Sequence, residues 1–541
     1  MTTDPVIEGL ANLGTLPTRH RPPSPSRGRL HTAIDVLTGM AGGLALWAAF
    51  PPVAAWPLAI LGVLLVTAGG HHAFAARGRF EPLPRRVGRA ALVGFAAGLA
   101  QFVPLLAWLR VVTPLAWLVL AVAEAAYIAV LVVGLGAVRV LPLWPLPAAM
   151  LWVAEEAVRA RLPLHGFTWG RLAFSQPDTP FTALAALGGA PLVTFAVALT
   201  AGLALAAGRA VRPPAPRLLA AAAALVAAAA LPGIGMLLPR PSDGTPLRVA
   251  VVQGNVPQPG THFLGRAQQV LANHVQESKR LAAQVTDGRR PAPQLVFWPE
   301  NASDVDPLRT PSARAEIQDV VDSLGVPVLV GAVVDDGPNH LRNEGIVWLP
   351  RTGPAESYAK RHLVPFGEYM PWRGLVSHLT SLTSLVPKDF VSGRGDGMLK
   401  VGDTRIAEVI CFEIAFDDMV RTGVAAGGQL IVVQTNNATY MGTAEPAQQL
   451  AISQFRAVEH GRAVVVASTS GISAIIMPDG RIVDRSRQLT PAILDRVVPL
   501  RGSLTLADRL GAIPEWLLAS VGILAFGVAT VVERRRNRRG A

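Results

Sequence analysis

The stretch RIAEVICFEIAFDD, residues 405–418, contains Cys411, the only cysteine of the 541-residue chain. Apolar and polar residues alternate up to the thiol, which is typical of a strand, and a stretch typical of a helix begins at Glu413. One sulfur excludes an intrachain disulfide and any multi-cysteine metal site, so Cys411 is either an inert buried thiol or a nucleophile. Sheets of α/β proteins place reacting groups at the carboxyl ends of strands. The position of Cys411 therefore favours a nucleophile in an α/β domain.

Residues 243–505 around this stretch are long enough for one domain with a sizeable core. Short apolar runs alternate with helical patterns, which indicates a layered α/β domain whose sheets are buried on both faces. The expected strands are 247–253, 295–300, 326–334, 344–349, 405–411, 429–435 and the segment 462–483, with a hairpin turn at Asp479-Gly480, and the expected helices are 266–285, 312–324 and 448–460.

The rest of the chain is dominated by apolar runs of about 20 residues, the length that a helix needs to cross about 30 Å of hydrocarbon. Hydrophobic residues make up 51% of the sequence. Eight membrane spans are expected, seven in 32–240 and one after the α/β domain: 32–50, 53–72, 90–109, 114–137, 143–158, 180–207, 217–238 and 513–532.

Arginine placement orients these spans. Clusters of arginine lie in both tails and in alternate connections: 19–29, 77–89, 209–217 and 534–539. The intervening connections hold only Arg110, Arg159, Arg161 and Arg171. By the positive-inside rule both tails, 1–31 and 533–541, are cytoplasmic, and the α/β domain faces outward because seven spans precede it.

The formal net charge of +12 raises the question of a nucleic-acid partner. Most of the excess lies in the short cytoplasmic connections and tails, where it serves orientation and contact with anionic lipid headgroups, so no nucleic-acid role is expected.

The tail before residue 32 is rich in Pro, Ser and Arg and is expected to be disordered, with no removable signal peptide. The chain has no Walker loop, GxSxG elbow, HExxH or dinucleotide fingerprint, so neither a metal nor a cofactor is expected.

Three expected strands are followed by residues that could take part in a reaction. They are Glu300 in LVFWPEN (295–301), Lys360 in YAKRHLVPFGEYMPW (358–372) and Cys411. Lys360 is one of only four lysines among 49 Lys and Arg residues, which hints that a compact point charge is needed there. Taken singly, each residue has an ordinary explanation: a surface carboxylate, a basic residue at a tolerant position and a buried thiol.

Taken together, in this order, the three resemble the Glu-Lys-Cys triad of the nitrilase superfamily, and the membrane spans narrow the likeness to the apolipoprotein N-acyltransferase family. The likeness covers nearly the whole chain after residue 30. The segments that carry it are GFTWGRLAFSQ (166–176), VVQGNVPQ (251–258), WPEN (298–301), KRHLVPFGEYMP (360–371) and ICFE (410–413).

This resemblance implies an αββα sandwich on an eight-helix bundle in the bacterial cytoplasmic membrane. It also implies a cofactor-free, monomeric acyltransferase. The acyl donor would be a phospholipid, and the acceptor would be the N-terminal α-amino group of a diacylglyceryl-cysteine apolipoprotein.

The catalytic roles that the resemblance implies make physical sense. A free thiol is only a few per cent thiolate at neutral pH, so Glu300 would take its proton as Cys411 attacks the ester. The Lys360 ammonium would stabilise the thiolate and then the tetrahedral oxyanion. A thioester and a lysophospholipid would result, and the lipoprotein amine would then attack the thioester.

Further positions follow from the same resemblance. Glu368 and Glu413 would position the triad or the incoming amine, although Glu413 also suits an ordinary first-turn charge of a helix. Phe412 stands where the family usually has Tyr, and His262-Phe263 stand where Trp is expected. His262, Phe263 and Trp169 are candidates for lipid or lid contacts, and Trp169 also suits ordinary interfacial anchoring.

Two alternatives remain. A membrane-anchored nitrilase-like amidase would use the same triad and let water attack the thioester. A polytopic transporter or receptor with an external binding domain would not need the thiol at all.

Overall fold

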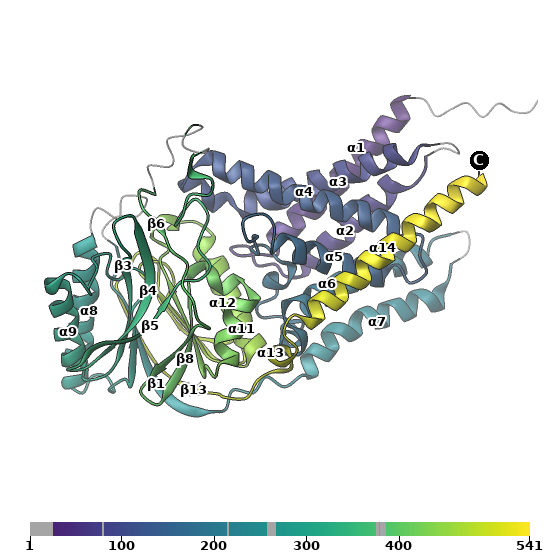
Figure 1. Ribbon diagram of the computed structural model, residues 1–541. Helices are drawn as coiled ribbons and strands as arrows, with labels where there is room; N and C mark the ends of the chain where they lie inside the picture. Colours follow the sequence, from purple (N-terminus) through teal and green to yellow (C-terminus); the bar gives the residue numbers. More distant parts are fainter. Residues whose placement is uncertain are drawn as a thin grey trace, which may run out of the picture.

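The computed structural model describes residues 25–77, 81–213, 216–256, 267–374, 378 and 386–540. Most of its long helices form a bundle beside an α/β part (Figure 1). Several of these helices begin with proline, whose fixed φ suits a first turn. The bundle helices are α1 (Pro25–Ala48), α2 (Pro57–Phe74), α3 (Leu83–Leu105), α4 (Pro114–Val138), α5 (Pro145–Arg159), α6 (Ala185–Ala210), α7 (Leu218–Leu237) and α14 (Ile513–Gly540).

Each expected membrane span falls on one of these helices, but six of them are long and apolar enough to cross a membrane within the described ranges. These are α2, α3, α4, α6 with its preceding turn, α7 and α14. The other two expected spans, 32–50 and 143–158, correspond to α1 and α5. Helix α5 has only 15 residues, and α1 carries Arg29, His31 and Asp35 in its first half. The expected count of eight spans is therefore not confirmed.

The α/β part contains two sheets. The first has the strand order β13-β1-β2-β3-β4-β5 with β6 paired to β4, and the second has the order β12-β11-β10-β9-β8-β7. The first contains β1 (Thr245–Gln253), β2 (Leu295–Phe297), β3 (Val328–Asp335), β4 (His340–Leu349), β5 (Gly353–Ala359), β6 (Asp389–Phe390) and β13 (Ala492–Leu500). The second contains β7 (Met398–Val401), β8 (Thr404–Ile410), β9 (Leu430–Thr435), β10 (Val464–Ser468), β11 (Ala474–Ile476) and β12 (Ile482–Arg485).

The centre of each sheet is parallel. Strands β1, β2 and β3 run parallel in the first sheet, and β8, β9 and β10 run parallel in the second. Their carboxyl ends therefore gather along one edge of each sheet, where connecting loops can carry reacting groups.

The two sheets pack face to face and are covered by helices on both outer sides. Apolar residues of both sheets, such as Phe297 and Val432, share one buried cluster between them. Helices α8 (Ala267–Thr286) and α9 (Pro311–Leu324) cover the first sheet. Helices α11 (Asp417–Ala425) and α12 (Glu445–His460) cover the second and lie between it and the bundle (Figure 1). This order of layers is the expected αββα sandwich.

Direct contacts join α12 to the bundle. The Gln448 side chain accepts a hydrogen bond from Trp169 Nε1–H at 2.7 Å and donates to the carbonyl oxygens of Pro51 and Leu105 at 3.2 and 3.3 Å. The short helix α13 (Leu506–Leu510) then leads from the sheets into α14. The helices that could cross a membrane are thus held directly against the layer that backs the second sheet.

Candidate active site

Cys411 follows directly after β8, at the carboxyl end of a central parallel strand, as the sequence predicts. The expected helix from Glu413 is wrong: residues Cys411–Ala415 form a 3₁₀ turn, and helix α11 begins at Asp417. Cys411 itself has a φ of 55°, and the Ile410 N–H donates to Glu413 at 2.7 Å, which closes the turn. Left-handed φ values are uncommon for residues other than glycine and cluster at functional sites.

Lys360 follows β5 and lies in the interior, with only 1% of its surface exposed. Its Nζ lies 3.3 Å from Glu300 Oε1 and 2.8 Å from Glu368 Oε1. Glu300 lies in the loop after β2. The structure thus brings together an ammonium group and two of the three carboxylates that the sequence analysis singled out.

Glu300 is held by donors from both sheets. Asn343 of β4 donates from Nδ2 to Glu300 Oε1 at 2.7 Å, and the same group reaches Glu368 Oε1 at 3.2 Å. The backbone N–H of Asn436, just after β9, donates to Glu300 Oε2 at 2.7 Å. Both oxygens of Glu300 are therefore fixed in direction before any substrate arrives.

The charges of Glu300 and Lys360 also act on the Cys411 thiol. Burial raises the pKa of the Cys411 thiol, the charge of Glu300 raises it further, and the nearby Lys360 ammonium opposes both. Burial lowers the pKa of Lys360, but Glu300, Glu368 and Cys411 outweigh it and hold that pKa well above its ordinary value. The resting site therefore contains an ammonium and a protonated thiol, so the thiol must lose its proton during attack.

Glu413 joins the segments that carry Lys360 and Cys411. Besides the Ile410 N–H, its fully buried carboxylate accepts the N–H groups of Arg361 at 2.7 Å and His362 at 2.9 Å, and the Tyr358 hydroxyl at 2.9 Å. Burial raises the pKa of Glu413, and these backbone donors oppose the rise. Its carboxylate thus caps the 3₁₀ turn after β8 and also binds the segment 358–362, an arrangement suited to a positioning residue.

Phe412 belongs to an aromatic cluster beneath the turn. Its ring centroid lies 6.1 Å from that of Trp169, 5.9 Å from Phe167 and 5.0 Å from Phe416. Trp169 is only 3% exposed. Arg159 donates a hydrogen bond to its carbonyl oxygen at 2.8 Å, and its indole N–H donates to Gln448. Trp169 therefore packs inside the protein. The sequence analysis had instead suggested an exposed position in contact with lipid. His262 and Phe263 lie outside the described residues.

Sequence reasoning missed several polar groups beside the three residues. Asn343, Asn436 and Gln449 all donate to Glu300, Glu368 or the Cys411 sulfur. Asp304, four residues after Glu300, has two buried oxygens without a hydrogen-bond partner among the described residues. Burial, and then the charge of Glu300, raise the pKa of Asp304 to about 7.

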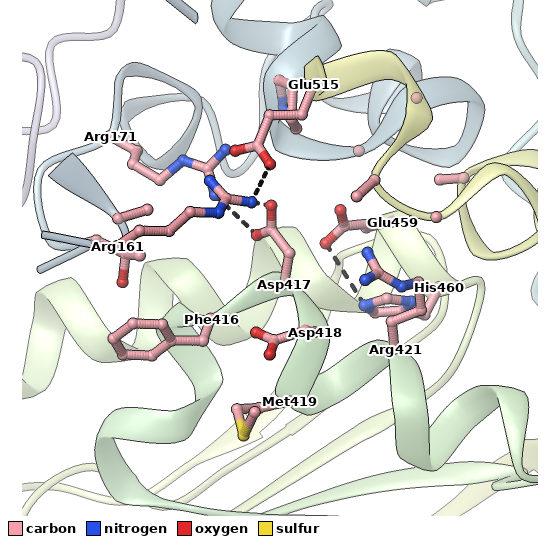
Figure 2. Close-up of a pocket in the computed structure, with 18 of the residues that line it drawn as sticks. Arg161, Arg171, Phe416, Asp417, Asp418, Met419, Arg421, Glu459, His460 and Glu515 are labelled. Carbon is pink, nitrogen blue, oxygen red and sulfur yellow. Dashed lines mark hydrogen bonds and ion pairs between the residues drawn. The ribbon is translucent and has the colours of Figure 1, made fainter. Parts of the chain in front are cut away.

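A cavity of about 470 Å³ lies where the bundle meets α11 and α12 (Figure 2). Charged side chains line it, and Arg161 and Arg171 point toward Asp417 and Glu515 across it. Its lining includes none of Glu300, Lys360 and Cys411. We therefore assign this cavity to the contact between the two parts of the molecule and not to the candidate active site.

Comparisons with known proteins agree with this architecture. Residues 42–203 match the family model of the apolipoprotein N-acyltransferase N-terminal domain, and residues 248–500 match that of carbon-nitrogen hydrolase. An apolipoprotein N-acyltransferase of Mycolicibacterium smegmatis is 40% identical over 531 residues, covering 93% of this chain and 86% of that protein. One from Azotobacter vinelandii is 34% identical over 409 residues, covering 73% and 74%.

Among solved structures, an amidase from Nesterenkonia sp. AN1 matches 49% of this chain and 98% of its own, with 19% identity and a TM-score of 0.35. That likeness is too low to support any argument. The two family models and the full-length relatives confirm the resemblance and the enzyme class that the sequence motifs indicate. The chain belongs to the apolipoprotein N-acyltransferase family, a membrane-bound branch of the nitrilase superfamily of enzymes.

Proposed function

We propose that this enzyme transfers an acyl chain from a membrane phospholipid, through a thioester on Cys411, to the α-amino group of a diacylglyceryl-cysteine lipoprotein. The observation that carries the proposal is the buried Lys360 ammonium bound to Glu300 and Glu368, beside a strained strand-end thiol. This arrangement offers a nucleophile, a base and a fixed positive charge in one place.

In the first half-reaction, Cys411 Sγ attacks the ester carbonyl of the phospholipid while Glu300 takes the thiol proton. The oxyanion of the tetrahedral intermediate forms near Lys360 Nζ, which is already held in place by carboxylates and gains a third interaction. When the intermediate collapses, the carbon–oxygen bond of the ester breaks. Glu300 returns the proton to the leaving oxygen, so a lysophospholipid departs and a neutral thioester remains.

In the second half-reaction, the α-amino group attacks the thioester carbonyl and Glu300 takes a proton from the nitrogen. Collapse of this intermediate breaks the carbon–sulfur bond and forms an amide. The proton returns to Cys411, so the enzyme is restored. Glu368 and Glu413 act as positioning residues for Lys360 and for the strand ends.

Attachment to the membrane has a physical reason in this reaction. Moving an acyl chain of about 15 methylenes into water costs on the order of 12 kcal/mol at about 0.8 kcal/mol per methylene. Six helices suited to crossing a membrane, packed against the layer that carries Gln448, support a site close to the bilayer surface.

For the topology we propose eight crossings of the bacterial inner membrane. They are the six helices that are long and apolar enough to cross, together with α1 and α5. Residues 1–31 and 533–541 would then be cytoplasmic, and the domain 243–505 would face outward. The arginine clusters at the ends of α3, α6 and α14 support this orientation. An impermeant thiol reagent added to intact spheroplasts should label Cys411, since no other cysteine competes; labelling only after lysis would overturn the topology.

The decisive experiment is intact mass spectrometry of the purified protein after mixing with phospholipid. One added acyl mass, removed by hydroxylamine, is expected on the wild type and absent from Cys411→Ala. Addition of a diacylglyceryl peptide should then move the label to the peptide amine. Release of the label as free fatty acid would instead support the amidase alternative, and full function of Cys411→Ser would support a transporter or receptor.

A further inference from the structure

A buried chain of hydrogen bonds leads from the end of β10 to the Cys411 sulfur. Gln449 of α12 donates from Nε2 to Cys411 Sγ at 3.8 Å. Its Oε1 accepts hydrogen bonds from Thr435 Oγ1 at 2.9 Å and from Asn437 Nδ2 at 3.0 Å. Gln449, Thr435 and Asn437 are all nearly or fully buried, so water cannot replace these partners freely.

The chain begins at a backbone group that can only donate. The Gly471 N–H donates to Ser468 Oγ at 2.9 Å, so the Ser468 hydroxyl hydrogen is free to donate to Asn437 Oδ1, also at 2.9 Å. Asn437 must then present its NH₂ group to Gln449 Oε1. Gln449 must in turn present its NH₂ group to the sulfur.

Close packing leaves the chain little freedom to rearrange. A Cβ added at Gly471 would collide with Asn437 Oδ1 and Ser468 Oγ. Glu445, at the first turn of α12, accepts the second hydrogen of Asn437 Nδ2 at 2.8 Å. Both hydrogens of that amide are thereby used, one on Gln449 and one on Glu445.

The titratable groups that act on the thiol include Glu300, Lys360, Glu445 and Tyr440, and Gln449 and Thr435 are polar neighbours that do not titrate. Burial, opposed by the Asn437 hydrogen bond, raises the pKa of Glu445 to about 8. Glu445 is therefore mostly neutral at pH 7, and its ionisation at higher pH would add a negative charge near Cys411.

We propose that Gln449 is a positioning residue of the acyl transfer, which directs the Cys411 sulfur and stabilises its thiolate with an N–H whose orientation Asn437 and Glu445 set. Gln449 complements Lys360 from the α12 side of the site, and it stabilises the thiolate both when the sulfur attacks and when the thioester is broken. The inference deepens the proposed function and rests on it for its meaning, although its test does not require acyl transfer.

The test measures the alkylation rate of Cys411 by iodoacetamide between pH 6 and 10 on the full-length protein in detergent, read by intact mass. Cys411 is the only cysteine, so each added mass reports on one sulfur. Below the thiol pKa the rate is proportional to the thiolate fraction, and a hydrogen bond to a charged group corresponds to about one pKa unit. Gln449→Leu should therefore react about tenfold more slowly at pH 8, and Gln449→Glu should react more slowly still.

Two further variants separate this role from a general packing defect. Asn437→Asp replaces the donor that orients Gln449 and should also slow alkylation, whereas Glu445→Gln removes the ionisable neighbour and should speed it above pH 8. Gln454→Leu, on the same helix and without a side-chain hydrogen bond among the described residues, is the matched control and should match the wild type.

Opposite shifts for Gln449→Leu and Glu445→Gln would support the assignment. A wild-type rate profile for folded Gln449→Leu would overturn it, as would equal slowing in Gln449→Leu, Asn437→Asp and Glu445→Gln. If Gln449→Leu does not fold, Gln449→Glu can replace it, because it should also slow alkylation whereas Glu445→Gln should speed it. Loss of acyl transfer with an intact alkylation pattern would count against the proposed function alone.

Discussion

Cys411, the proposed nucleophile, has a backbone conformation that L-residues rarely adopt. Its φ of 55° is readily available to glycine but costs other residues roughly 1 kcal/mol or more. We therefore expect Cys411→Gly to unfold at a higher temperature than Cys411→Ala, although both lack the thiol and neither is expected to form an acyl-enzyme. Thermal unfolding of the two variants in the same detergent measures the difference. A less stable Cys411→Gly would mean that the turn carries no strain at this residue.

Substitution of Lys360 tests whether the site needs a compact ammonium group or whether any positively charged group is sufficient. Its ammonium fits between Glu300 and Glu368 with almost no exposed surface, and a planar guanidinium is larger and spreads its donors in a fork. Lys360→Arg should slow formation of the acyl-enzyme about 100-fold or more, close to the effect of Lys360→Ala. Single-turnover mass spectrometry measures the rate.

Lys388→Arg is the matched control for this substitution, because Lys388 is half-exposed and pairs with Asp335 at 3.3 Å. It should keep the wild-type rate. Near-normal turnover in Lys360→Arg would rule out the tight oxyanion site.

The sequence indicates a candidate reacting residue more readily than the residues that orient it. Glu300 and Cys411 each follow a short apolar strand, whereas Lys360 follows the mostly polar β5 and was singled out by its rarity and its sequence context. Asn343 and Gln449 act through side-chain direction across two sheets and a helix, and no local pattern encodes that direction.

At the scale of elements, the segment after β5 and the turn after β8 are joined by Glu413 and by the close contact of two aromatic rings. The His362 ring centroid lies 3.7 Å from that of Phe416. Burial, and then the charges of His165 and Lys360, lower the pKa of His362 to about 4. The unfolded chain therefore binds a proton below about pH 6.5 that the folded chain does not bind until about pH 4.

Because the unfolded state binds more protons in this window, stability falls as the pH drops from 6.5 toward 4. His362 should account for about 2 kcal/mol of loss between pH 7.5 and 5. Buried His274, whose pKa is also lowered to about 4, should add a similar amount. Replacement by an aromatic ring that cannot titrate, His362→Phe, should therefore remove about half of the combined loss.

Apparent melting temperatures at pH 7.5 and 5 measure the His362 effect. The exposed His378→Phe is the control and should leave the difference between the two pH values unchanged. An unaltered pH difference in His362→Phe would show that His362 is not the titrating group.

The elements themselves were predictable to different degrees. Buried strands such as β1, β8 and β9 follow from short stretches rich in apolar residues, which alternate with polar residues in β8. The antiparallel pairing of β13 with β1 joins residues almost 250 positions apart, and local periodicity does not contain such pairings. The helix expected at Glu413 was wrong because the left-handed Cys411 and the Glu413 hydrogen bonds favour a 3₁₀ turn.

At the scale of the whole molecule, the α/β part and the bundle meet through a buried ionic cluster. Arg171 donates two hydrogen bonds of 2.8 Å to the Asp417 carboxylate, and Arg456 donates a third of 2.8 Å. Burial raises the pKa of Asp417, but the two guanidinium groups outweigh it and hold that pKa well below its ordinary value. The cluster therefore stabilises the fold above about pH 4, and this contribution is lost as the pH falls further.

Asp417→Asn tests whether this cluster holds the two parts together. The substitution leaves two buried guanidinium groups short of negative charge, and breaking a buried pair in this way costs about 3–5 kcal/mol. The apparent melting temperature should fall by several degrees, and acyl transfer should weaken because α12 and Gln448 lose their fixed place against the bundle. Asp418→Asn is the matched control, since its exposed carboxylate makes no hydrogen bond or ion pair among the described residues, and it should melt like the wild type. Equal melting of the two variants would mean that apolar packing alone joins the bundle to the α/β part.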